Sequence, residues 1–187
     1  DRNDTAIVYF NRADSLYALA GYKYKSAFLF IDLAHIYVNQ GNTKNAIELI
    51  RKAIAYYQED KNQPGLAMCY HQMATAYGNL GDDKSEMQAN IAALKILEEL
   101  HDLKEQANCL QSIGRILAYM DEYAPALSYL QRGLAMAKAA NNAEKGINGL
   151  ESVVMCYNSI GLVYIDLDDN KKALRYFDSA LTAAVQL

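Results

Sequence analysis

One pattern of large and small residues, present four times, constrains the fold of this 187-residue chain most. Each copy has large residues at its first, fourth and eighth positions and a small residue at its fifth. The copies are Phe30-x2-Leu33-Ala34-x2-Tyr37, Tyr70-x2-Met73-Ala74-x2-Tyr77, Leu110-x2-Ile113-Gly114-x2-Leu117 and Tyr157-x2-Ile160-Gly161-x2-Tyr164. These offsets lie on one stripe of an α-helix, and the small residue lets a second helix approach closely. The pattern therefore predicts packing between helices, not reactivity.

A second apolar helix follows most of these copies. Its pattern is Ala46-x3-Ile50-x2-Ala53, repeated at Ala126-x3-Leu130-x2-Gly133 and Ala173-x3-Phe177-x2-Ala180. The intervening segments hold residues that end one helix and cap the next, at Gly41-Asn42-Thr43, Gly81-Asp82-Asp83, Asp121 to Pro125 and Asp168-Asp169-Asn170. Two helices joined by such a turn form an antiparallel hairpin.

The four copies with their second helices resemble the tetratricopeptide repeat, in a form of forty residues. The resemblance implies an all-α fold, a right-handed superhelical solenoid of antiparallel hairpins within one domain, residues 1–187. The sequence departs from the family pattern in that it has no Trp, no proline closes the repeats, and Glu86 and Asn90 replace a small and a bulky apolar residue in the second hairpin. The fourth copy also comes forty-seven residues after the third. We expect the seven extra residues to lengthen helices, with a turn at Asn141-Asn142.

The repeat register predicts the boundaries of five segments. They are a second helix of a truncated repeat at 1–25, then hairpins at 26–62, 63–102, 103–141 and 142–187. The first segment carries Ala6-x3-Phe10-x2-Ala13, the second-helix pattern without its first helix. We expect that the chain was cut from a larger protein; a lone capping helix is the alternative.

Composition and charge disfavour several classes of function. The net charge is −4, and neither Lys nor Arg is concentrated in one segment, which argues against nucleic-acid binding. Since apolar runs are short, we expect no membrane contact by this fragment. Cys69, Cys109 and Cys156 lack metal-like spacing and precede apolar stripe positions, so we expect buried structural thiols. Unpaired thiols favour the cytoplasm, and a periplasmic sensor segment stays open as an alternative.

Motifs typical of enzymes are missing from the sequence: it holds no HExxH, GxSxG or P-loop. We therefore expect neither an enzyme nor a bound cofactor. Asp32, His35 and His71 suggest a metal site, but two histidines are too few ligands for a closed site, and we predict none.

The resemblance also implies a binding groove lined by one face of the first helices. The predicted groove residues are Asp32, His35, Asn39, His71, Gln72, Thr75, Asn79, Gln111, Ser112, Arg115, Tyr119, Asn158, Ser159 and Asp166. Their amides and hydroxyls suit hydrogen bonding to an extended peptide. We therefore expect a module that binds a protein or peptide segment and serves as the sensory or regulatory part of a larger signalling protein. The alternative is a structural scaffold that assembles complexes or self-associates as a homo-oligomer.

Overall fold

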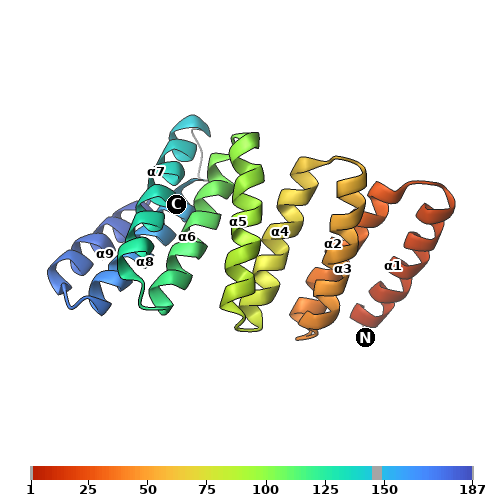
Figure 1. The fold of residues 1–187 in the computed structure, drawn as a ribbon, viewed down its shortest axis with the longest axis horizontal. Helices are drawn as coiled ribbons and strands as arrows, with labels where there is room; N and C mark the ends of the chain where they lie inside the picture. The colour runs from red at the N-terminus through yellow and green to blue at the C-terminus, as the bar shows by residue number, and fades with distance from the viewer. Residues whose placement is uncertain (1, 145–148, 187) are drawn as a thin grey trace. The chain divides into compact units, whose positions relative to one another are not determined.

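The computed structural model describes residues 2–144 and 149–186. Within these residues the chain forms nine α-helices and no strand (Figure 1). They are α1 (Arg2–Leu19), α2 (Lys23–Asn39), α3 (Thr43–Glu59), α4 (Gln63–Asn79), α5 (Asp83–Leu100), α6 (Leu103–Tyr119), α7 (Tyr123–Glu144), α8 (Leu150–Asp166) and α9 (Asn170–Ala184). The expected fold class, an all-α helical repeat solenoid, is confirmed. None of the described helices is long and apolar enough to cross a membrane.

The chain divides into two compact units, residues 1–96 and 97–187. In the first unit α1 packs on α2, α2 on α3 and α3 on α4. In the second unit α6 packs on α7, α7 on α8 and α8 on α9, and α6 also contacts α8. Neighbouring helices in each unit run antiparallel, as hairpins require (Figure 1).

The turns between paired helices follow the predicted residues. Gly41 and Gly81 have φ of +75° and +69°, the left-handed conformation that glycine adopts without strain. The side chains of Asp82 and Asp169 cap the next helices, accepting hydrogen bonds from the backbone N–H groups of Ser85 and Lys172, both at 3.1 Å. Asn42 precedes α3 without a side-chain cap, so its predicted capping role is wrong.

The predicted turn at Asn141-Asn142 is also wrong. Both residues lie in the last turns of α7, which continues to Glu144 and reaches 22 residues. Asparagine costs little in a helix, and α7, which packs against α8, continues past both residues. The extra residues therefore lengthen α7 before the chain enters α8.

Two small residues of the repeat, Gly114 and Gly161, mark close contacts between paired helices. A Cβ atom added at Gly114 would lie 2.6 Å from Cγ of Leu130, and one added at Gly161 would lie 2.7 Å from the ring of Phe177. Each glycine is thus covered by a large side chain of the second helix. The large residues of the pattern, such as Ile113 and Ile160, are buried in the same layer.

We predict that Gly114→Leu lowers the free energy of unfolding by about 1 to 3 kcal/mol, because overpacking forces Leu130 and the helix backbone to shift. Urea denaturation measures the change. Ala124→Leu, at an exposed position of α7, is the matched control and should change stability little. An unchanged midpoint for Gly114→Leu would contradict the close contact.

Candidate functional site

The predicted groove residues of the first unit lie on α2 and α4, which contact each other. Asp32, His35 and Asn39 are exposed along one stripe of α2. On α4, Thr75 and Asn79 are exposed, whereas His71 and Gln72 are half-buried; the Thr75 hydroxyl donates to the backbone oxygen of His71. This face of the first unit is polar.

In the second unit, two of the predicted groove residues bind each other. The Gln111 side-chain amide donates a hydrogen bond of 2.7 Å to the Ser159 hydroxyl, and both residues are buried. The Ser152 hydroxyl donates to the Asn108 side-chain oxygen, also at 2.7 Å. These bonds join α6 to α8, so we assign Gln111 and Ser159 to helix packing.

The remaining predicted residues of the second unit are accessible. Asn158 and Asp166 are exposed on α8, while Ser112 and Arg115 are half-buried on α6. The Arg115 guanidinium lies 5.5 Å from the centre of the exposed Tyr119 ring, a cation–π distance. Arg115 is therefore held in place beside an aromatic surface.

Three exposed apolar residues of α8 were missing from the predicted set. Met155, Leu162 and Ile165 are 45%, 58% and 45% exposed, and their spacing of seven and three places them on the stripe that carries Asn158. Leu162 occupies in α8 the repeat position that Arg115 occupies in α6. We call α6 and α8 residues Arg115, Tyr119, Met155, Asn158 and Leu162 the unit-2 face. The sequence signal was available, since these apolar residues fall outside the buried register.

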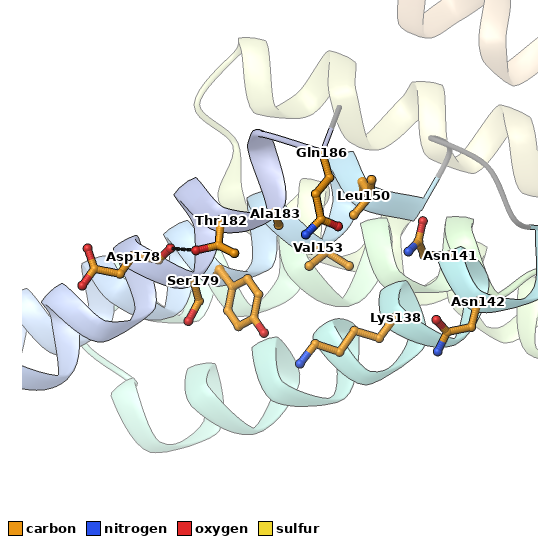
Figure 2. Close-up of a pocket in the computed structure, with 11 residues that line it drawn as sticks. Lys138, Asn141, Asn142, Leu150, Val153, Asp178, Ser179, Thr182, Ala183 and Gln186 are labelled. Atoms are coloured by element: carbon orange, nitrogen blue, oxygen red, sulfur yellow. Dashed lines mark hydrogen bonds between the residues drawn. The ribbon is translucent and has the colours of Figure 1, made fainter.

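A pocket of about 480 Å³ lies elsewhere in the second unit, where α7, α8 and α9 meet (Figure 2). We call it the α7–α9 pocket. None of the fourteen predicted groove residues lines it. Its lining is Lys138, Asn141 and Asn142 of α7, Leu150, Val153 and Tyr157 of α8, and Asp178, Ser179, Thr182, Ala183 and Gln186 at the end of the chain. The sequence signal for it was the seven-residue insertion, which lengthens α7 toward this pocket.

The three cysteines are free and buried, as expected. Burial raises the pKa of each thiol, Cys69, Cys109 and Cys156, to about 12. A thiol with so high a pKa is protonated at neutral pH and is a poor nucleophile or metal ligand. In the described part of the chain, no group of three or more His, Cys, Asp or Glu side chains could hold a metal ion.

Because the pKa values of these thiols are raised, we predict that the fold loses stability at alkaline pH. Their folded pKa exceeds the ordinary value of 9.0, so above about pH 9 the unfolded chain loses protons that the folded chain retains. Stability should be constant with respect to these groups below pH 9 and fall as the pH rises toward 12. Tyr57, whose pKa burial raises to about 12, adds to the fall above pH 10.

Urea denaturation between pH 7 and 10.5, with reductant present, measures this effect. The triple variant Cys69→Ala, Cys109→Ala, Cys156→Ala should start less stable but lose less stability over that range. Parallel pH profiles for the two proteins would contradict the assignment.

Comparison with known proteins identifies the repeat independently. Two sequence models described as tetratricopeptide repeat match the chain, one at residues 29–60 and 156–184 and the other at residues 106–144. The matches together span just over half of the chain. No curated protein matches the sequence significantly.

Solved structures share the fold at low sequence identity. Aspartyl phosphate phosphatase F from Bacillus subtilis is 19% identical with a TM-score of 0.83, over 98% of this chain and 48% of that protein. A Rap protein complexed with competence and sporulation factor is 15% identical with a TM-score of 0.75, over 98% and 50%. A signal transduction ATPase from Pyrococcus horikoshii, which has a tetratricopeptide repeat sensor, is 20% identical with a TM-score of 0.75, over 97% and 28%. This chain thus spans half or less of these proteins.

Proposed function

The chain belongs to the tetratricopeptide repeat family, whose fold is generally a non-catalytic protein-interaction module, and we propose that it binds an extended segment of another protein. The observation that carries the proposal is the unit-2 face. There, exposed Met155 and Leu162 on α8 accompany the amide of Asn158, and α6 contributes Arg115 beside Tyr119. Exposed apolar side chains interspersed with amides are what an extended peptide needs: anchors for its side chains and partners for its backbone.

Within this binding function, we propose that the chain is the sensory or regulatory part of a larger signalling protein. Its support is that one similar structure is described as a signal transduction ATPase with a tetratricopeptide repeat sensor. A second similar structure is described as a Rap protein complexed with competence and sporulation factor. Both are longer than this chain. In such a protein the segment bound here would act on a domain elsewhere.

Arg115 is the residue of the unit-2 face that we expect to contribute most to binding. Its guanidinium presents several donors in a fixed fork, and stacking near Tyr119 reduces the entropy lost when it binds a carboxylate or carbonyl group. Removal of a charged hydrogen bond costs on the order of 1 to 3 kcal/mol, roughly a tenfold to hundredfold change in Kd.

The test begins with selection of peptides from a displayed random library on the intact chain. Arg115→Ala should weaken the selected peptides tenfold to hundredfold in calorimetry, and Leu162→Ala should also weaken them. Lys171→Ala, an exposed cation of α9, is the control and should bind as wild type does. Thermal unfolding checks that each variant is folded. The proposal fails if no peptide is enriched, or if the enriched peptides bind all variants equally.

A second candidate function, a scaffold that self-associates, has its own supporting observation on α9. Leu174 and Leu181 are 62% and 65% exposed. In the repeat register they correspond to Ile47 and Ile54 of α3, which are covered because the following helix, α4, packs on α3. The α9 face is thus an apolar helix face of the type that packs against another helix.

Self-association predicts a mass that rises with protein concentration in sedimentation velocity. Leu174→Glu with Leu181→Glu should keep the chain monomeric, because two charges cannot be buried in an apolar interface. Ile91→Glu, at an exposed apolar position of α5, is the control and should leave the association unchanged. Monomeric wild type at the highest concentration rules this candidate out.

A further inference from the structure

The α7–α9 pocket is formed by a departure from the repeat. The other described helices have 15 to 18 residues, whereas α7 has 22, so its last turns reach beyond the usual hairpin. Gly149, just before α8, lies against this extension: an added Cβ would be 2.5 Å from the backbone nitrogen of Asn141. Only glycine permits that contact without a shift of backbone. The contact fixes Asn141 at the edge of the pocket.

The floor of the pocket is apolar. Val153 and Ala183 are 5% and 8% exposed, and Leu150 is half-buried beside them. In Figure 2, Gln186 and Asn141 lie on either side of Leu150 and Val153. The volume, about 480 Å³, falls in the range of ligand pockets in proteins. The floor can therefore take an apolar side chain between two amide groups.

Polar groups around this floor have unused hydrogen-bonding capacity. The side-chain amides of Asn141, Asn142 and Gln186 have no hydrogen-bond partner among the residues that the structure describes. The hydroxyls of Ser179 and Thr182 donate to backbone oxygens of their own helix, at 2.9 and 2.8 Å, and so remain acceptors. Amides with both donors and acceptors match the alternating N–H and C=O groups of a peptide backbone.

One cation stands at the edge of the pocket. The Lys138 ammonium lies 5.0 Å from the centre of the Tyr157 ring. The carboxylate of Asp178, the acidic residue of the lining, points away from Lys138 in Figure 2. Lys138 therefore keeps its charge available for an anionic group of a ligand, held near an aromatic face.

We propose that the α7–α9 pocket binds a short peptide segment in which an apolar side chain is followed by a carboxylate. The apolar side chain rests on Val153 and Ala183, the amides of Asn141 and Gln186 bind its backbone, and the carboxylate pairs with Lys138. This site goes beyond the unit-2 face and shares no residue with it. Either site can fail without affecting the other.

The test uses two matched peptides, acetyl-Gly-Gly-Leu-Asp-Gly-amide and the same peptide with Asn in place of Asp. Titration of the ¹⁵N-labelled intact chain with the acidic peptide should move the amide signals of Val153, Tyr157 and Ser179 to saturation. The Asn peptide should bind about tenfold more weakly, because it lacks the charged partner of Lys138.

Lys138→Gln removes the charge but keeps most of the side chain. Because Lys138 is exposed, we expect the variant to fold as wild type does. It should bind the acidic peptide about tenfold more weakly than wild type does, and bind both peptides equally, which is the signature of a direct pair. Lys171→Gln, the same change outside the pocket, should keep wild-type affinity and the preference for Asp. The proposal is overturned by an absence of saturable shifts at millimolar peptide, by an unchanged preference in Lys138→Gln, or by shifts centred on Met155 and Leu162.

Discussion

The close contact between paired helices at one small residue is the constraint on which the α6–α7 and α8–α9 hairpins depend. At Gly114 and Gly161 the space for a Cβ is already filled by Leu130 and Phe177. This short separation brings the large residues of both helices into one buried layer and turns the opposite side of the first helix outward. The exposed faces proposed for binding therefore exist because the small residue fixes how each first helix is rotated.

Hydrogen bonds between first helices add a second constraint in residues 97–187. Gln111 binds Ser159, both of which are buried, and the half-buried Asn108 binds the buried Ser152, so polar groups are paired between α6 and α8. A buried amide left without a partner costs about 1 to 3 kcal/mol, so these pairs also favour one register of the two helices. Amide and hydroxyl side chains, which we propose bind a peptide on an exposed face, thus also join α6 to α8.

Departures from the repeat supply features that the scaffold alone does not have. The insertion after the third copy lengthens α7, and Gly149 lets this extension pack against the start of α8. A pocket lined by an apolar floor, by side-chain amides and by Lys138 results. Uniform repeats give similar faces, whereas this insertion contributes Asn141 and Asn142 to a pocket that lies apart from the repeated faces.

The helices, their pairing into hairpins and the burial of the three cysteines could all be predicted from the sequence, because they follow from local periodicity and from turn residues within a few positions. Only the structure shows that Gln111 donates its hydrogen bond to Ser159, forty-eight residues away, and that Asn141 lies in a helix instead of a turn. It also shows that the pocket combines Lys138, Val153 and Thr182. Such outcomes depend on contacts between segments far apart in the chain, where the same amide or hydroxyl can face a neighbouring helix or the solvent. Periodicity predicts which side of a helix a residue occupies, but its contacts on that side depend on which other element packs there.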